Sequence, residues 1–91
     1  MLIAIDYDGT ITAAPDLFAV FCSAARQLGH QLVILTMRYE SEPIESRYEQ
    51  MVDRVIYTGR KAKGPFAKEL GLSVGVWVDD RPDFILFDAA S

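Results

Sequence analysis

The sequence has little cysteine, no long apolar run and no excess of positive charge. Its one cysteine, Cys22, cannot form an internal disulfide, which fits a reducing compartment. No apolar run approaches the ~20 residues that a membrane helix needs. The first residues reach Asp6 without the basic and apolar segments of a signal peptide. We therefore expect a cytoplasmic protein that does not cross a membrane.

Charge and length narrow the classes of function further. Nine Lys and Arg against thirteen Asp and Glu give a net charge of -4, which disfavours sequence-independent binding of nucleic acid. The 91 residues, 51% of them hydrophobic, are enough for one modest core and too few for a second domain. We expect a single domain that spans residues 1–91.

Four short apolar runs predict strands. Uninterrupted runs of this kind are typical of strands that are covered on both faces of a parallel sheet. Helical patterns separate them, and the alternation predicts an α/β, Rossmann-like three-layer fold with at least four parallel strands. The runs cover residues 2–5, 32–35, 55–57 and 74–78; the helices are opened by Pro15, Ser41 and Gly64-Pro65, and the first and third are stopped by Gly29 and Gly71.

The segment 82–90 fits two structures. Its apolar residues Phe84 to Phe87 have the composition of a strand. The residues between Asp79 and Asp83 are far fewer than the dozen or so that a parallel crossover needs. A helix that starts near Pro82 or an antiparallel edge strand are therefore the two alternatives, and periodicity does not decide between them.

Acidic side chains follow two of the predicted strands. Asp6 and Asp8 come after the first strand, and Asp79 and Asp80 after the fourth. Ligands of open α/β sheets bind outside the carboxyl ends of the strands, where these carboxylates would converge and repel one another unless a cation lay among them. Hard oxygen ligands in a cytoplasm favour Mg²⁺.

Three further residues add a phosphate site to this prediction. Thr36 ends the second strand, and Lys61 and Lys63 precede the fourth. A hydroxyl and an ammonium opposite a metal would hold a phosphoryl group and neutralise its charge.

These motifs together resemble a known family. The run Asp6-Tyr7-Asp8-Gly9-Thr10 after an apolar strand is similar to the first motif of the haloacid dehalogenase-like (HAD) superfamily of phosphohydrolases. Thr36 resembles the second motif, a lysine before the fourth strand the third, and Val78-Asp79-Asp80 the fourth. The resemblance extends from residue 2 to about residue 83, with the motifs in order.

The resemblance implies a role for each residue. Asp6 would be the nucleophile that forms an aspartyl-phosphate, and Asp8 the general acid and base. The Asp6 and Asp79 carboxylates and the Asp8 backbone carbonyl would hold Mg²⁺, with support from Asp80. Thr36 would donate a hydrogen bond to the phosphoryl oxygens.

The chain also departs from the family pattern. Lys63-Gly64 resembles the Lys-Gly of some members, whereas Lys61 is nearer the usual spacing, so both stay candidates for the third motif. Few residues separate Gly9 from Pro15, and no insertion follows the third strand, so we expect a capless member. Its open site would take a phosphorylated small molecule or the end of a macromolecule, nucleic acid included. A second subunit could cover the site.

Parts of this pattern also fit other functions. A catalytically idle family member that binds phosphate or a partner protein is the main alternative. A signalling receiver domain would need a carboxylate after the third strand, where this chain has Thr58-Gly59. Arg38 is expected either to reach a substrate or to be solvated, Thr10 to stabilise the turn after the first strand, and Cys22 to lie in the core.

Overall fold

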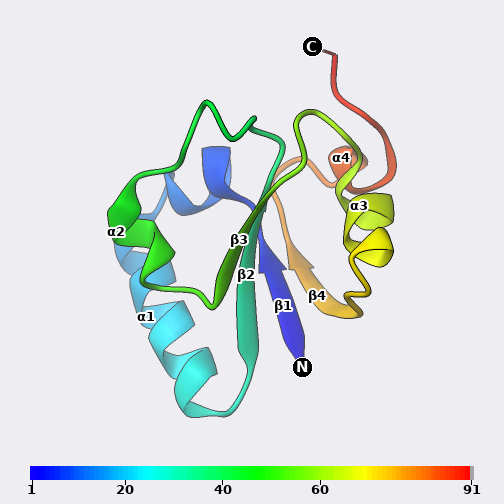
Figure 1. The fold of residues 1–91 in the computed structure, drawn as a ribbon. Helices are drawn as coiled ribbons and strands as arrows, with labels where there is room; N and C mark the ends of the chain where they lie inside the picture. Colours follow the sequence, from blue (N-terminus) through cyan, green and yellow to red (C-terminus); the bar gives the residue numbers. More distant parts are fainter. Residues whose placement is uncertain (91) are drawn as a thin grey trace.

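The computed structural model describes residues 1–90 and contains a central sheet of four parallel strands, with helices on both faces (Figure 1). This confirms the predicted α/β architecture, and no cap is inserted between its elements in the described range. In chain order the elements are β1 (Leu2–Ile5), an irregular helical turn η1 (Tyr7–Ile11), α1 (Pro15–Gln27), β2 (Gln31–Thr36), α2 (Ser46–Glu49), β3 (Arg54–Tyr57), α3 (Lys63–Glu69), β4 (Val74–Val78) and α4 (Asp83–Leu86).

The strand order places the two acidic motifs side by side. The order is β3-β2-β1-β4, and all neighbouring strands are parallel. Ile5 of β1 pairs with Ile34 on one side and with Val78 on the other. The chain therefore builds outward from β1 to β3 and then returns to the opposite side of β1. The carboxyl ends of β1 and β4 form the point at which the direction of winding changes, where ligands of such sheets bind.

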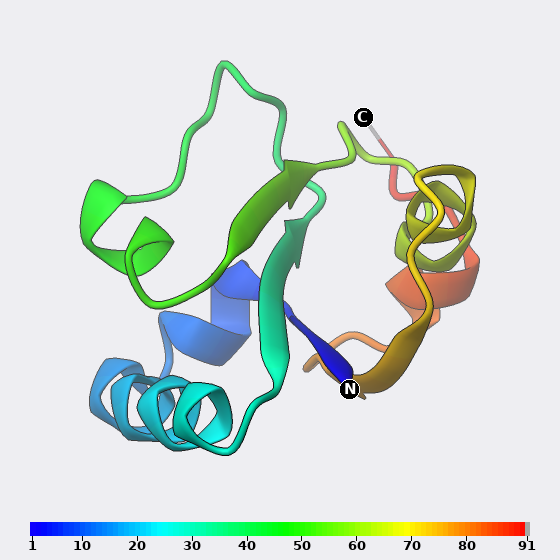
Figure 2. The same cartoon turned by 60° about the horizontal axis from the view of Figure 1, so that its bottom comes forward.

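Alternating side chains of the strands pack into two separate cores, one on each face of the sheet. Figure 2 shows the helices that cover these two faces. Ile3 and Ile5 lie with α1 and α2, whereas Ala4 between them faces α3. Cys22 of α1 is buried in the first core, as expected from its place among apolar residues. Both faces are covered, which explains why the strands are uninterrupted apolar runs.

The predicted start of the second helix at Ser41 is wrong. The helix α2 covers only Ser46–Glu49, and the preceding segment is irregular. Its backbone N–H groups have other acceptors: that of Ile44 donates to the Tyr57 hydroxyl at 3.1 Å and that of Glu45 to the Tyr7 hydroxyl at 3.3 Å. Pro43 has no N–H to contribute to a helix. Tertiary hydrogen bonds therefore replace the first helical turn that the sequence pattern predicted.

The tail takes the helical alternative. The helix α4 begins at Asp83, directly after Pro82, and packs near α3 on the same side of the sheet (Figure 1). Beyond it, the N–H of Ala89 donates to the carbonyl of Arg60 at 2.9 Å, which ties the tail to the loop after β3. The tail thereby reaches the carboxyl edge of the sheet.

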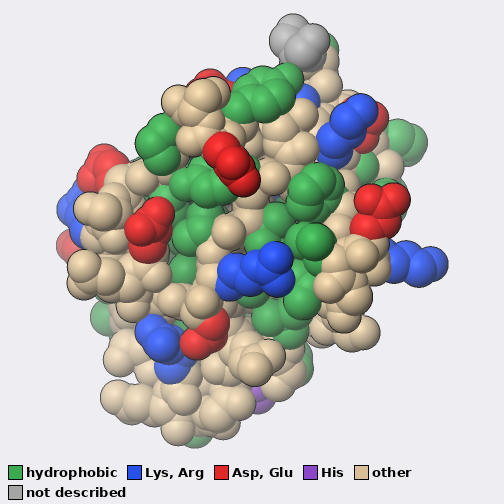
Figure 3. All heavy atoms as spheres, in the orientation of Figure 1, with side chains coloured by type: hydrophobic (Ala, Val, Ile, Leu, Met, Phe, Trp, Pro, Cys, Tyr) green, Lys and Arg blue, Asp and Glu red, His purple; other side chains and the backbone are tan. Residues whose placement is uncertain are grey.

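Charged side chains are dispersed over the face drawn in Figure 3. There, acidic and basic side chains are scattered, some singly and some next to a side chain of opposite charge, and neither sign dominates this view. Electrostatic attraction of a polyanion such as nucleic acid requires an extended patch of positive charge, and the face in Figure 3 does not present one. Within residues 1–90, none of the helices has both the length and the apolar character required to cross a membrane.

Candidate active site

The turn after β1 brings the first site aspartate against the end of β4. Asp6 directly follows β1, and its backbone N–H donates to the carbonyl of Val78 at 2.9 Å. At Gly9 the backbone has φ +81°, and a Cβ atom there would lie 2.5 Å from Oδ2 of Asp80. Glycine therefore allows both the left-handed conformation and the close approach between the turn and β4.

Three carboxylates meet at this junction, and we call them the acidic cluster: Asp6, Asp79 and Asp80. One oxygen of each lies within 4.8 Å of the others. The Thr10 hydroxyl lies 3.1 Å from Oδ2 of Asp6 and 3.2 Å from Oδ1 of Asp80, so its single proton bridges two members. The same hydroxyl oxygen accepts the Asp80 N–H at 3.2 Å. Thr10 thus stabilises the turn and also holds the acidic cluster together.

Lys63 supplies the positive charge within the acidic cluster. Its Nζ donates to Oδ1 of Asp6 at 2.7 Å and to Oδ2 of Asp79 at 2.6 Å, and its side chain is only 3% exposed. Lys61, the other candidate, has a 69% exposed side chain that lies 4.0 Å from Asp88, away from the cluster. Of the two lysines, the structure brings Lys63 alone to the predicted site.

Burial shifts the ionisation of the acidic cluster. Loss of hydration raises the pKa of Asp6 from 3.8 to about 6; the neighbouring Asp80 carboxyl acts in the same direction and Lys63 in the opposite one. The pKa of Asp80 is lowered, chiefly because its carboxylate accepts a hydrogen bond from the Asp6 carboxyl. When all three carboxylates are ionised, a single ammonium leaves them with excess negative charge. Carboxylate oxygens are the ligands that Mg²⁺ prefers, so this donor set fits a divalent cation.

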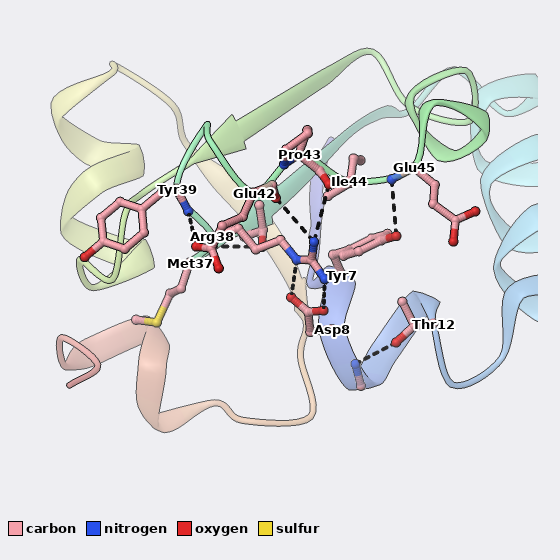
Figure 4. A network of polar contacts seen from close by, with 12 residues as sticks. Tyr7, Asp8, Thr12, Met37, Arg38, Tyr39, Glu42, Pro43, Ile44 and Glu45 are labelled. Carbon is pink, nitrogen blue, oxygen red and sulfur yellow. Dashed lines mark hydrogen bonds and ion pairs between the residues drawn. The ribbon is translucent and has the colours of Figure 1, made fainter. Parts of the chain in front are cut away.

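The second aspartate of the motif has a different partner. The carboxylate of Asp8 lies outside the acidic cluster and forms a bidentate ion pair with Arg38, Nε to Oδ2 at 2.9 Å and Nη2 to Oδ1 at 2.8 Å (Figure 4). Both residues line the same pocket as the cluster. Arg38 is therefore not simply solvated, because its guanidinium contacts a predicted site residue.

Thr36 lies at the end of β2 and is almost completely buried. Its Oγ1 accepts the N–H of Arg38 at 3.3 Å and borders the pocket. In the described part of the chain, no acceptor is found for the hydroxyl proton of Thr36. That proton can therefore be donated to a ligand.

A pocket of about 290 Å³ connects these groups. It is lined by every residue predicted for the site except Lys61. The sequence patterns did not identify the other part of its wall, which includes Met37, Arg81 and Phe84. Met37 directly follows Thr36, and Arg81 directly follows the Asp79-Asp80 pair. This position next to a predicted strand end is the sequence signal that could have identified both as pocket residues. Phe84 enters only because the tail forms a helix beside the pocket.

Comparison with known proteins identified no relative of this chain. No family model matches the chain, and neither does any curated protein or solved structure. The interpretation of the pocket therefore depends on its own geometry: a buried carboxylate between a lysine and two further carboxylates, at the point where ligands bind in this class of sheet.

Proposed function

We propose that the protein is a Mg²⁺-dependent phosphohydrolase of the HAD-like type, which cleaves a phosphomonoester through an aspartyl-phosphate on Asp6. One observation carries the proposal. Asp6 lies at the junction of β1 and β4 in contact with Lys63 and within the acidic cluster, while the hydroxyl of Thr36 borders the same pocket. A nucleophile, a cationic group and a hydrogen-bond donor for phosphoryl oxygens are thus together.

In the first step, a carboxylate oxygen of Asp6 attacks the phosphorus atom. The bond between phosphorus and the leaving oxygen breaks, and the leaving oxygen takes a proton from the Asp8 carboxyl group. Lys63 and Thr36 bind the phosphoryl oxygens, whose negative charge they offset. The products of this step are the free alcohol and the aspartyl-phosphate.

In the second step, the Asp8 carboxylate accepts a proton from a water molecule. The water oxygen attacks phosphorus, and the bond from phosphorus to Asp6 breaks. Inorganic phosphate is released and both aspartates return to their starting states.

Asp6, Asp79 and Asp80 are the side chains that would hold Mg²⁺, together with the backbone carbonyl of Asp8. When bound, the ion neutralises negative charge on the phosphoryl group. The excess of carboxylates over ammonium groups in the acidic cluster supports this assignment.

The test is hydrolysis of p-nitrophenyl phosphate with Mg²⁺ and with a chelator. We expect turnover only with the cation. Asp6→Asn should lower kcat by about 10³-fold or more, as loss of a nucleophile does elsewhere. Asp16→Asn, the same chemical change on the exposed surface of α1, should leave kcat unchanged. Acid-quenched wild-type protein should carry radiolabelled phosphate, and Asp6→Asn should not.

Activity that survives Asp6→Asn would refute the assignment of the nucleophile. Binding of Mg²⁺ and phosphate by folded protein without turnover would instead support the catalytically idle alternative. The open pocket suits a phosphorylated small molecule or the end of a macromolecule. A cytoplasmic location and a second subunit over the pocket stay predictions.

A further inference from the structure

Arg38 forms an extensive set of contacts beside the acidic cluster. Besides the two bonds to Asp8, its Nη1 donates to the carbonyl oxygens of Glu42 at 3.2 Å and of Pro43 at 3.3 Å (Figure 4). A guanidinium has five N–H donors. Four of them are therefore used within the protein, which leaves Arg38 poorly suited to bind a phosphate with both arms.

The ring of Tyr7 restricts the guanidinium further. The Arg38 Cζ lies 5.0 Å from the centroid of this ring, which is buried in the first core. The Tyr7 hydroxyl in turn accepts the N–H of Glu45. One face of the guanidinium is thereby packed against a fixed aromatic ring, and its Nη1 is held by the carbonyls of Glu42 and Pro43.

The side chain of Asp8, by contrast, is held in its orientation mainly by Arg38. Its side chain is 54% exposed, and among the described residues its carboxylate accepts hydrogen bonds from Arg38 alone. Gly9 follows it directly. A half-exposed aspartate next to glycine samples several rotamers unless a partner selects one, and a bidentate fork fixes both oxygens at once.

From these contacts we propose that Arg38 is a positioning residue for the reaction. Its fork holds the Asp8 carboxyl group at the rim of the pocket for proton transfer to the leaving oxygen. In the acid form that makes this transfer, one oxygen of Asp8 carries the proton and the other still accepts a hydrogen bond from Arg38. The carbonyls of Glu42 and Pro43 and the ring of Tyr7 hold Arg38 in turn. The irregular segment before α2 therefore has a role in the site, although none of its residues needs to touch the substrate. This inference rests on the proposed phosphohydrolase function.

The test compares two esters in the same variants. An alkyl phosphate has a poor leaving group that needs a proton, whereas p-nitrophenyl phosphate does not depend strongly on one. Arg38→Met should lower kcat for the alkyl ester by about 10- to 100-fold, a part of the 10²–10⁴ that general acid catalysis contributes. It should change kcat for the aryl ester by less than about threefold and leave both KM values nearly unchanged, since only proton transfer is affected.

Further variants separate geometry from charge. Arg38→Lys keeps the charge but loses the fork, so it should resemble Arg38→Met. In an Asp8→Asn background, Arg38→Met should cause no further loss. The matched control is Arg47→Met, which removes an exposed arginine that also pairs with a carboxylate and stacks over a tyrosine, at Glu45 and Tyr48, outside the pocket. This control should hydrolyse both esters at the wild-type rate.

Several results would overturn the proposal. Equal losses of kcat with both esters, a large rise in KM, or losses that add to those of Asp8→Asn would each show that Arg38 acts other than through Asp8. Wild-type rates in Arg38→Met would show that Arg38 does not contribute to the reaction. If Arg38→Met fails to fold, Arg38→Lys carries the comparison.

One part of the test, the NMR measurement, does not require an active wild-type protein. If wild-type protein hydrolyses neither ester, the proposed function fails, and NMR then tests the positioning separately. Backbone order parameters at Asp8 and Glu42 should fall in Arg38→Met relative to Arg47→Met, because the links to Arg38 are lost. Unchanged order parameters would refute the positioning role.

Discussion

The substitution Lys63→Met offers the sharpest test of the buried charges. It removes the ammonium that donates to Asp6 at 2.7 Å and to Asp79 at 2.6 Å, while the methionine keeps most of the aliphatic volume. The two carboxylates have side chains that are 9% and 3% exposed, so water does not replace the lost partner. Removing one partner of a buried pair costs about 3–5 kcal/mol. This is a large part of the ~5–15 kcal/mol by which a domain is ordinarily stable.

Urea denaturation at pH 7.5 measures this loss, with Lys61→Met as the matched control. Lys61 makes only a 4.0 Å surface pair, so its substitution should cost less than about 0.5 kcal/mol. At pH 5 the cost of Lys63→Met should be smaller, because Lys63 lowers the pKa of Asp6 and its absence lets this carboxyl stay protonated. Saturating Mg²⁺ should stabilise Lys63→Met more than wild type, since the ion then meets less repulsion.

Equal stabilities of the two lysine variants at pH 7.5 would refute this reasoning. They would mean that the contacts of Lys63 with Asp6 and Asp79 contribute no more than a surface pair. A double variant, Lys63→Met with Asp79→Asn, should recover part of the loss, because it removes one of the two stranded charges.

Two further predictions concern the same junction. Because the pKa of Asp6 is about 6 in the folded protein and 3.8 otherwise, the folded state retains a proton between these values that the unfolded chain has released. The contribution of Asp6 to the free energy of unfolding of the metal-free protein should therefore fall by about 2 kcal/mol as the pH rises from 4 to 6.5, and Asp6→Asn should remove this contribution in urea titrations. Gly9→Ala should cost more stability than Gly29→Ala and weaken Mg²⁺ binding measured by calorimetry. Both glycines have positive φ, but only at Gly9 would the new Cβ meet a carboxylate, that of Asp80, whereas nothing lies within 4 Å at Gly29. Equal effects of the two alanines would contradict the close approach.

Most of the fold could be predicted because its signals are local. Apolar runs bounded by glycine, proline and aspartate identified all four strands, and parallel pairing then implied that Asp6, Thr36 and Asp79 lie at one edge. The choice between Lys61 and Lys63 could not be made in this way. It depends on where α3 begins relative to the sheet, and thus on packing rather than on sequence spacing.

The contacts of Arg38 could not be predicted for a related reason. Its contacts depend on the path of residues 39–45, which the local pattern assigned partly to a helix. That path is set by hydrogen bonds to the hydroxyls of Tyr7 and Tyr57, which come from distant parts of the chain. Long-range bonds of this kind override local helix propensity and leave no periodic trace in the sequence.

The strand order also determines when the pocket can exist during synthesis. Thr10 and Asp80, which hydrogen bond to each other, are 70 residues apart, and β1 finds its second neighbour only when β4 has formed. A nascent chain can pair β1 with β2 and β2 with β3 early, but one edge of β1 stays unpaired until β4 has been synthesised. Contacts of such sequence separation form slowly, because the loop must close before they contribute. The acidic cluster should therefore assemble late in folding and be lost early in unfolding, ahead of the β1–β2–β3 core.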